Sequence, residues 1–445
     1  MNISIIGVAK SGVSAAKLAA RKGYNVFVSE SKSSDQFKEE IKIFNELGIA
    51  YEFGGNSQKC LEKCDLIVTS PGVPSEINVF QQAEKKGLKI ISELEFGRSF
   101  IPNNKLIAIT GTNGKTTTTT LTNYLFNRSG RTSHAAGNIG IPISDLVDSI
   151  GENDLIVAEL SSFQLDRIDK FRPDVAMILN ITPDHLYYHK TFDNYRNAKF
   201  NICKNQTAND LLILNADDGE SSAKYADTRG TICYFSQNPV EYGIYAKDGK
   251  MRVRLPNMQK EEEIMLISEI GLPGVHNAYN AMAAALAARV FEIKNENIRD
   301  CLMAFEGVEH RLEKVRVLDG VEYINDSKAT NVNATWYALS SYNKPIVWIA
   351  GGRGDNNDYS LLDDVVKRNV QSIVAIGEEA DAIFNHFSSM KRCQKAYSME
   401  EAVQMARSQA ESGEVVLFTP ACKSFDWFLN YEHRGEVFKE CVDSL

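Results

Sequence analysis

The chain has 445 residues, and at roughly 150 residues per domain this length predicts about three domains. Hydrophobic residues make up 43% and charged residues 24%, as in an ordinary globular protein. The net charge of −9 argues against nucleic acid as the main partner, because phosphate backbones select basic faces.

The first region begins with a short apolar run that ends in a glycine turn. The segment ISIIGVAKSG leads into a helical stretch, and YNVFVSES then reads as a second strand that ends at Glu30. Such a β-α-β unit is the usual cradle of a dinucleotide or nucleotide. Its glycine spacing, G-x-x-x-x-G, differs from the compact G-x-G-x-x-G fingerprint, so a glycine-rich turn without a ligand is the alternative.

The second region follows a Pro- and Asn-rich linker, FIPNNK. Its predicted strands are KLIAIT, DLIVAEL, VAMILNI and DLLILNAD, and GVHNAYNAMAAALAARV is predicted to be a helix with a polar N-terminus. The sequence pattern changes at FEGVEHRLEKVRVLDG, where a third region begins. Its predicted strands are VEYINDS, PIVWIAGG, SIVAIG and EVVLFTPA. Alternating strands and helices predict an α/β protein.

The eight cysteines are spread along the chain, and only Cys60 and Cys64 lie close together. No second pair or histidine stands at zinc-finger spacing, so free thiols in a reducing cytoplasm are expected. The N-terminus has no signal-peptide pattern, and no apolar run approaches the roughly 18 residues of a membrane span.

The stretch ITGTNGKTTTTT has the form of a phosphate-binding loop between a strand and a helix. Gly111 and Gly114 permit a tight turn whose backbone N–H groups meet an anion at the positive end of the helix. Lys115 can reach the outer phosphates, and the hydroxyl of Thr116 suits Mg²⁺. The strict pattern asks for a glycine where Ile109 stands, but the strand–loop–helix context still predicts a nucleoside triphosphate site.

A second magnesium ligand is expected near this loop. Glu159 stands near the carboxyl end of the apolar strand DLIVAEL, where a metal-binding carboxylate sits in this architecture. The segment LNITPDHLYYHKTFDNYRNAKFNI carries His185 and His189, which suit either a metal pair on a helix or polar residues that cap a turn. Lys199 in the same segment reads, on physical grounds alone, as a solvated charge.

Two loops of the third region carry polar side chains after a predicted strand. Asp326 in YINDSKATN suits a ribose, a base or a metal, and Lys328 suits a phosphate. The segment Ala421–Ser424 joins a strand to a helix, and its N–H groups together with the Ser424 hydroxyl suit a carboxylate.

Taken together, these motifs resemble those of the Mur ligases, the ATP-dependent amide-forming enzymes of peptidoglycan precursor synthesis. The motifs run in the family's order over most of the chain: GTNGKTT, ELSSFQLD, NITPDHL, YRNAKFNI, HNAYNA, HRLE, NDSKATN and TPACKSFDWFLNYEHRG. Sister ligases and folylpolyglutamate synthases share the phosphate loop but differ in the later motifs. GNIGIP, ELSSFQLD and NDSKATN are similar to the branch of the family that adds D-glutamate.

The resemblance implies three α/β domains: a Rossmann-like domain for a UDP-sugar at 1–97, a central P-loop ATPase-type domain at 98–306, and a Rossmann-like amino-acid-binding domain at 307–445. It implies that ATP phosphorylates the alanine carboxylate of UDP-N-acetylmuramoyl-L-alanine, and that D-glutamate then displaces the phosphate through a tetrahedral intermediate. The implied cofactors are two Mg²⁺ ions, replaceable by Mn²⁺, and CO₂ bound as a lysine carbamate. A cytoplasmic monomer is expected.

The resemblance also implies roles for residues at matching positions. The catalytic residues would be Lys115, His185 and Lys199, and the metal ligands Thr116, Glu159, His185 and Lys199, the last one carbamylated. ATP would be held by Gly111, Thr112, Asn113, Gly114, Lys115, Thr116, Thr117, Asn280, Arg311 and Asp326. The UDP-sugar side would be formed by Ser11, Gly12, Glu30, Gly72, Asn138, Ser161 and Gln164. The other substrate-binding residues would be Lys328, Thr330, Arg353, Ser424, Phe425 and Tyr431.

Two positions depart from the family pattern. Relatives usually carry a lysine or arginine after GG-x-x in the third domain, where GGRGDNNDY has Asp355. Either Arg353, two residues earlier, takes over as the carboxylate fork, or the amino-acid specificity is altered. In the first domain, Glu30 replaces the more usual aspartate.

Other classes of protein leave motifs unexplained. A nicotinamide-dependent oxidoreductase built on the first β-α-β unit has no use for GTNGKT and NDSKATN. The hypothesis of a P-loop switch or motor protein does not explain the third domain. The nearest alternative is a sister ligase that adds another amino acid, or adds glutamate to a folate, and SSFQLD and GNIGIP argue against it.

Overall fold

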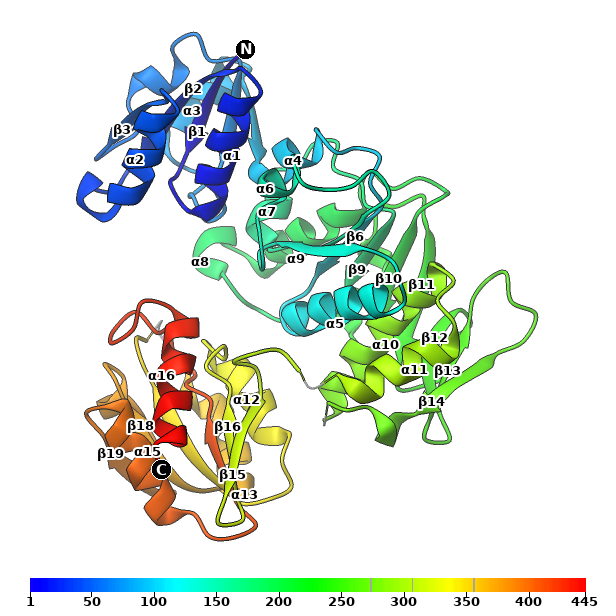
Figure 1. The fold of residues 1–445 in the computed structure, drawn as a ribbon, viewed down its shortest axis with the longest axis vertical. Helices are drawn as coiled ribbons and strands as arrows, with labels where there is room; N and C mark the ends of the chain where they lie inside the picture. The colour runs from blue at the N-terminus through cyan, green and yellow to red at the C-terminus, as the bar shows by residue number, and fades with distance from the viewer. Residues whose placement is uncertain (273, 306, 355–356) are drawn as a thin grey trace. The chain divides into compact units, whose positions relative to one another are not determined.

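The computed structural model describes residues 1–272, 274–305, 307–354 and 357–445. The chain divides into two compact units, one formed by Met1–Ile270 with Tyr279–Met303 and the other by Gly271–Ala278 with Ala304–Leu445. The described residues form three β-sheets, of five, nine and six strands, each with helices packed on it (Figure 1). The first and central sheets belong to the first unit and the third sheet to the second, so the predicted α/β class is confirmed.

The first sheet is a parallel sheet with helices on both faces. Its strand order is β3-β2-β1-β4-β5. Ile3 and Ile5 of β1 pack in one buried cluster with α1, whereas Ile6 points to the opposite face and packs with Phe80 of α3. The strands are β1 (Asn2–Ile6), β2 (Asn25–Glu30), β3 (Ala50–Phe53), β4 (Leu66–Thr69) and β5 (Lys89–Ser92), and the helices are α1 (Lys10–Arg21), α2 (Lys38–Glu46), α3 (Asn78–Lys85) and α4 (Glu93–Arg98).

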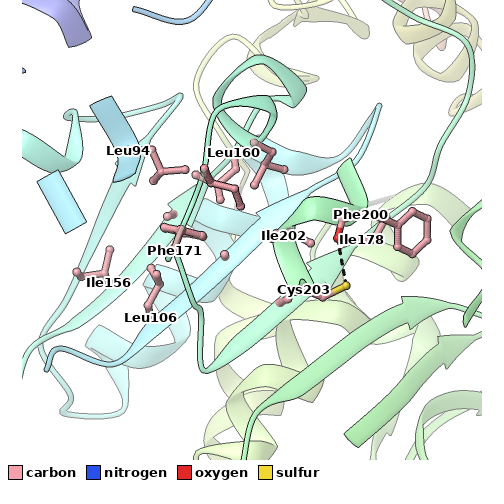
Figure 2. Close-up of a cluster of buried hydrophobic side chains, with 14 of the residues drawn as sticks. Leu94, Leu106, Ile156, Leu160, Phe171, Ile178, Phe200, Ile202 and Cys203 are labelled. Atoms are coloured by element: carbon pink, nitrogen blue, oxygen red, sulfur yellow. Dashed lines mark hydrogen bonds between the residues drawn. The ribbon is translucent and has the colours of Figure 1, made fainter. Parts of the chain in front are cut away.

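The central sheet has the strand order β14-β13-β12-β11-β10-β9-β6-β8-β7. Its strands from β7 to β12 run parallel, and β13 and β14 add an antiparallel edge. The strands are β6 (Leu106–Thr110), β7 (Ser133–Gly137), β8 (Leu155–Glu159), β9 (Val175–Ile178), β10 (Leu211–Asn215), β11 (Thr231–Ser236), β12 (Gly243–Lys247), β13 (Lys250–Arg254) and β14 (Glu262–Leu266). Their apolar side chains account for the core on one face, where Leu106, Ile156 and Ile178 lie with Phe171 (Figure 2).

The helices of the central region position the polar loops at the carboxyl edge of this sheet. They are α5 (Lys115–Arg128), α6 (Ile143–Leu146), α7 (Ser162–Asp166), α8 (Leu186–His189), α9 (Phe192–Phe200), α10 (Val275–Val290) and α11 (Asn295–Ala304). Helix α5 packs against β7 and β8. Thr118 and Thr119 are fully buried in it, so packing outweighs the weak helix propensity of the threonine run.

The third sheet has the strand order β15-β16-β20-β17-β18-β19, and all neighbours except β15 and β16 are parallel. Its strands are β15 (Glu313–Leu318), β16 (Val321–Asn325), β17 (Ile346–Gly351), β18 (Val370–Ile376), β19 (Arg392–Lys395) and β20 (Val415–Phe418). Its helices are α12 (Val332–Ser340), α13 (Asp363–Asn369), α14 (Ala380–Phe387), α15 (Met399–Gln409) and α16 (Tyr431–Asp443). This unit is also of the doubly wound type, with a covering layer on each face.

In the described part of the chain, none of the helices combines the length and the apolarity that crossing a bilayer requires. The eight cysteines, all among the described residues, are free thiols, as predicted.

Candidate active site

The glycine loop predicted to bind phosphates connects β6 to α5 at the carboxyl edge of the central sheet. Gly114 has a left-handed backbone (φ 82°) and directly precedes α5, whose first turn offers unpaired N–H groups to an anion. A Cβ atom at Gly114 would lie 2.4 Å from Oδ1 of Asn280. Asn280 of α10 therefore packs directly on the loop, in contact with a predicted phosphate-binding residue.

Asn180, which sequence reasoning missed, fixes the same loop. Its side chain accepts a hydrogen bond from the Asn113 N–H at 2.8 Å and donates one to the Asn113 carbonyl at 3.0 Å. Its own carbonyl accepts from the Thr112 N–H at 2.9 Å, and the Thr112 hydroxyl lies 3.0 Å from that of Tyr195. The loop is thus held in shape by polar groups of the protein, and the asparagine that directly follows the strand VAMIL was the signal for it.

Two lysines converge on carbonyl oxygens of this loop. Lys115 Nζ donates to the carbonyls of Gly111 and Thr112, each at 2.8 Å. Lys199 Nζ donates to the Gly111 carbonyl at 2.7 Å, and Lys199 is 2% exposed. Burial, reinforced by the charge of Lys115, holds the pKa of the Lys199 side chain well below its usual range. The interpretation of Lys199 as a solvated charge is therefore wrong, because its helix packs it against the loop.

Glu159 ends β8 beside the strand that leads into the loop. The register pairs it with Ile109 of β6, and the residue is 2% exposed. The Asn138 side chain donates to Oε1 of Glu159 at 2.8 Å, whereas Oε2 is buried with no hydrogen-bond partner among the described residues. A buried carboxylate oxygen left unpaired is costly, so this donor set suits a bound cation.

The two histidines after NITPD have different surroundings. His185 precedes α8 with a left-handed backbone (φ 52°), and its ring packs on Phe163 with centroids 4.8 Å apart. Nε2 of His189 lies 2.9 Å from the hydroxyl of Ser162, and burial lowers the pKa of His189. The structure supports the polar alternative for His189, and His185 stays the candidate metal ligand of the two.

Ser161 and Gln164, predicted on the UDP-sugar side, form a helix cap. The Ser161 hydroxyl accepts from the Gln164 N–H at 3.3 Å, and Gln164 Oε1 accepts from the Ser161 N–H at 2.9 Å. This reciprocal capping box begins α7 and fixes both side chains. Sequence reasoning missed this structural duty, although the spacing S-x-x-Q signals it.

The glycine turn of the first sheet is closely packed. A Cβ atom at Gly12 would lie 2.0 Å from the carbonyl oxygen of Gly7, so α1 approaches the turn too closely for a side chain. Glu30, at the end of β2, is 8% exposed and its carboxylate accepts from two backbone N–H groups, at 2.8 and 3.0 Å. Ser11 is half-buried at the start of α1, and Gly72 has a left-handed backbone (φ 82°) beside open space. All lie at or near the carboxyl edge of this sheet.

The segment Gly137–Pro142, with the sequence GNIGIP, contacts both regions of the first unit. Asn138 at one end of it holds Glu159, as described above. The Gly140 carbonyl accepts from Nζ of Lys10, at the start of α1, at 2.7 Å. A single short loop therefore joins the glycine turn of the first sheet to the buried carboxylate of the central sheet.

In the second unit, Asp326 follows β16 and is 1% exposed. The Thr419 hydroxyl donates to its Oδ2 at 2.9 Å, and the Leu312 N–H donates to Oδ1 at 3.2 Å. Burial raises the pKa of Asp326 to about 6, although the positive charge of Arg311 opposes this rise. Arg311 and Asp326, both predicted to bind nucleotide, are thus brought within electrostatic reach of each other.

Three more predicted residues lie close together at the start of α16 and the loop after β16. Lys328 Nζ donates to the Tyr431 hydroxyl at 3.1 Å and lies 4.9 Å from the centroid of its ring. The Thr330 N–H donates to the Lys328 carbonyl at 2.9 Å. These bonds give the NDSKATN loop a defined shape beside the helix.

The loop after β20 carries Ser424, which is buried, and Phe425, which is 57% exposed. Arg353, after β17, forms an ion pair with Glu378 at 2.8 Å. Its backbone pairs with that of Lys423. The substituted position Asp355 lies outside the described residues.

Three family models match the chain in succession. They are described as the Mur ligase MurD-like N-terminal domain, over residues 1–92, the Mur ligase middle domain, over 109–288, and the Mur ligase, glutamate ligase domain, over 310–422. Two relatives are the UDP-N-acetylmuramoylalanine–D-glutamate ligases of Salinibacter ruber and Chloroherpeton thalassium. Each is 42% identical to this chain, and the alignments cover 99% of this chain and 97% and 98% of the relatives.

Solved structures show a likeness in fold. The UDP-N-acetylmuramate-alanine ligase MurC of Thermotoga maritima superposes with a TM-score of 0.60 at 19% identity, covering 100% of this chain and 99% of that one. A MurF structure from Acinetobacter baumannii gives a TM-score of 0.61 at 16% identity, covering 99% and 93%. These similarities extend over all three sheets.

Proposed function

The chain belongs to the Mur ligase family, and from that membership we propose that it joins D-glutamate to UDP-N-acetylmuramoyl-L-alanine at the expense of ATP. The observation that carries this function is the 42% identity, over nearly the whole of both chains, to ligases named for that reaction. The products are the amide, ADP and phosphate, and the reaction belongs to peptidoglycan precursor synthesis. We propose that the reaction takes place in the cytoplasm.

The reaction requires activation because a carboxylate is a poor acyl donor. The carboxylate oxygen of the alanine attacks the γ-phosphorus of ATP, the bond to ADP breaks, and an acyl phosphate forms. The amine nitrogen of D-glutamate then attacks the acyl carbon and gives a tetrahedral intermediate. The intermediate loses phosphate as the C–O bond breaks, and the nitrogen loses a proton as the amide forms.

The loop 111–117 binds the phosphates of ATP in this proposal. Backbone N–H groups at the start of α5 provide donors for the phosphate oxygens. Lys115 exchanges the carbonyls of Gly111 and Thr112 for the outer phosphates, which brings a positive charge to the oxygens that gain charge in transfer. Asn280 supports the loop from α10, and Arg311 and Asp326 are proposed as further nucleotide-binding residues.

The donors beside the loop, of which Glu159 and Thr116 are buried, fit magnesium. Glu159 offers the unpaired Oε2 that a cation would satisfy, and Thr116 and His185 supply an oxygen and a nitrogen donor. Mg²⁺ or Mn²⁺ bound there would neutralise phosphate charge while two anions approach each other. Asn138 orients Glu159 for this task through its bond to Oε1.

Lys199 is proposed to bind CO₂ as a carbamate. An ammonium is a poor metal neighbour, whereas a carbamate offers anionic oxygens to a cation. The side chain is 2% exposed and donates to the Gly111 carbonyl, so its nitrogen lies at the phosphate loop and away from bulk water. Both features support a modified lysine at this place.

The remaining substrate-binding residues are assigned according to the region of the chain in which they lie. The UDP-sugar is proposed to contact Ser11, Gly12, Glu30, Gly72, Asn138, Ser161 and Gln164, and D-glutamate to contact the loops that carry Lys328, Thr330, Ser424, Phe425 and Tyr431. We propose domain limits at 1–97, 98–306 and 307–445, and a monomeric enzyme. The 307 limit lies near the boundary of the second compact unit at Ala304.

An amino-acid-dependent phosphate-release assay tests the function. Purified protein with ATP, Mg²⁺ and UDP-N-acetylmuramoyl-L-alanine is expected to release phosphate when D-glutamate is added. Release with L-lysine or diaminopimelate and none with D-glutamate would contradict the specificity. Oxidation of a reduced nicotinamide without any need for ATP would contradict the class of enzyme.

A further inference from the structure

Helix α8 is a single turn with a left-handed residue at each of its ends. His185, which precedes the helix, has φ 52°, and Lys190, which follows it, has φ 68°. A left-handed backbone is unfavourable for residues with a Cβ atom, and a helix of one turn has little stability of its own. Such a segment keeps its shape only where the surrounding structure holds it, and strained residues of this kind cluster at functional sites.

His189 is the buried residue of α8, whereas Leu186 and Tyr187 are exposed. Nε2 of His189 lies 2.9 Å from the hydroxyl oxygen of Ser162, which is itself buried at the start of α7. The carbonyl of His189 accepts a hydrogen bond from the side chain of Asn194, in α9, at 2.8 Å. The side chain and the backbone of His189 are therefore bonded to two neighbouring helices.

The ring of Phe163 lies against both His189 and His185. Its centroid is 5.7 Å from that of His189, with the two ring planes 15° apart, and 4.8 Å from that of His185. The two histidines, four positions apart, thus pack on the same ring. Phe163 directly follows Ser162 in α7, so one short helix contacts both histidines. The position of the His185 ring therefore depends on how α8 is fixed to α7.

We propose that His189 is a positioning residue, which through its hydrogen bond to Ser162 fixes α8 and so holds His185 in place to bind the metal. The proposal rests on the proposed function, in which His185 is a ligand of Mg²⁺. Metal ligands depend on the groups that orient them, and loss of such a group typically weakens metal binding about 10- to 100-fold. The bond is buried, so removal of one partner leaves the other without a replacement from bulk water.

Helix α7 contributes to two parts of the proposed site. Its capping residues Ser161 and Gln164 are proposed to contact the UDP-sugar, whereas the two residues between them, Ser162 and Phe163, contact α8. The capping box fixes the start of α7, so the partner of His189 has a defined position. The motif SSFQ is thus proposed to serve the sugar with its outer residues and the metal ligand with its inner ones.

The magnesium dependence of phosphate release by the full-length enzyme tests this assignment. Ser162→Ala removes the hydroxyl, and His189→Phe keeps a ring without the nitrogen. Each variant is expected to raise the half-saturating concentration of Mg²⁺ roughly 10- to 100-fold. At saturating Mg²⁺ the KM for D-glutamate is expected to stay within about twofold, because the amino acid is assigned to loops of the other unit. A smaller fraction of folded enzyme would lower the maximal rate and leave the half-saturating Mg²⁺ concentration unchanged.

Binding of Mn²⁺ gives a readout that does not require turnover. Mn²⁺ is titrated into the enzyme without nucleotide, and the electron paramagnetic resonance signal of the free ion reports how much is bound. Both single variants are expected to bind Mn²⁺ about 10- to 100-fold more weakly than the wild type. The double variant Ser162→Ala/His189→Phe is expected to bind no more weakly than the single variants, because all three lack the same hydrogen bond.

Two further variants serve as comparisons. His386→Phe also removes a histidine hydrogen bond, since Nε2 of His386 lies 2.8 Å from Oδ1 of Asp363 in the second unit, and it is expected to leave the magnesium dependence unchanged. Ser162→Thr keeps a hydroxyl and is expected to recover part of the loss seen in Ser162→Ala. Thermal unfolding of every variant without metal shows whether the fold is retained.

Wild-type values of Mn²⁺ binding and of half-saturating Mg²⁺ in either single variant would overturn the assignment, because the bond needs both partners. Additive losses in the double variant would also overturn it, since the two residues would then act independently. Failure of the proposed function looks different. In that case the wild-type enzyme itself releases no phosphate with D-glutamate at any concentration of Mg²⁺.

Discussion

The side-chain amide of Asn138 donates to Oε1 of Glu159 at 2.8 Å, and Oε2 of the same carboxylate is buried with no partner among the described residues. One oxygen is therefore fixed by the protein, and the other is the one to which the proposed cation would bind. Asn138 was predicted on the sugar side of the site, and the structure gives it a second task at the carboxylate.

Asn138→Ala is expected to weaken magnesium use about 10- to 100-fold, because a metal-binding carboxylate loses the group that orients it. Magnesium titrations of phosphate release measure this change as a higher half-saturating concentration. Asn45→Ala, an exposed asparagine of the first sheet region, is the control and is expected to behave as wild type. An identical magnesium response in both variants would contradict the role of Asn138.

Lys199→Ala is expected to lower activity by at least about 100-fold, because the proposal gives this residue an anionic group beside the phosphates. Added formate or acetate is expected to restore part of the rate by supplying the missing carboxylate. Phosphate release with increasing formate measures the recovery. Full activity of the unsupplemented variant would remove Lys199 from the mechanism.

Gly114→Ala is expected to impair ATP binding more than folding. Both Gly114 and Gly130 have left-handed backbones, with φ 82° and 80°, so alanine strains either position by about 1 to 2 kcal/mol. Only at Gly114 would the new Cβ meet the Asn280 side chain, at 2.4 Å, whereas at Gly130 nothing lies within 4 Å. Gly130→Ala is thus a matched control for the strain, and similar KM values for ATP in the two variants would contradict the contact.

Glu93, at the start of α4, predicts a pH-dependent stability. It is 1% exposed, its Oε1 accepts from the Ser144 N–H at 2.7 Å, and burial raises its pKa to about 7. Because the folded pKa lies above the unfolded one, near 4.5, this carboxyl stabilises the fold when protonated. That contribution is complete below about pH 4.5 and is lost as the pH rises through about 7, with a total of about 3 kcal/mol.

Glu93→Gln keeps the acceptor for Ser144 and cannot ionise. Its unfolding midpoint is expected to exceed that of wild type at pH 8 by more than at pH 5. Glu76→Gln, an exposed carboxylate, is the control and is expected to show no such widening. A gap of equal size at both pH values would mean that Glu93 does not titrate in this range.

Local sequence patterns were enough to predict the strands that are buried apolar runs and the turns that contain glycine. The strands that border the phosphate loop, such as Leu106–Thr110 and Leu155–Glu159, were predicted because every residue in them is buried and, apart from Glu159, apolar or small. The last two strands at one end of the central sheet, Lys250–Arg254 and the edge strand Glu262–Leu266, were missed, because their charged residues interrupt any continuous apolar signal.

The contacts within the candidate site could not be predicted from local patterns, because they join residues that are far apart in the sequence. The loop motif predicted Lys115, but the position of Lys199 at the same carbonyl depends on a contact between α9 and Gly111, 88 positions away in the sequence. The backbone pairing of Arg353 with Lys423 joins two separate loops and is likewise beyond any local pattern. Motif resemblance named candidate residues, and only the fold relates them in space.

The loop Gly137–Pro142 has one end on Lys10 and the other on Glu159. A few residues of main chain in the first unit therefore set the distance between the glycine turn proposed to bind the sugar nucleotide and Glu159, the proposed metal-binding carboxylate. A longer loop would increase the distance that a substrate has to span between the two regions. None of the residues that contact the substrate would have to change. The length of the substrate that receives the amino acid is thus expected to vary with the length of this loop.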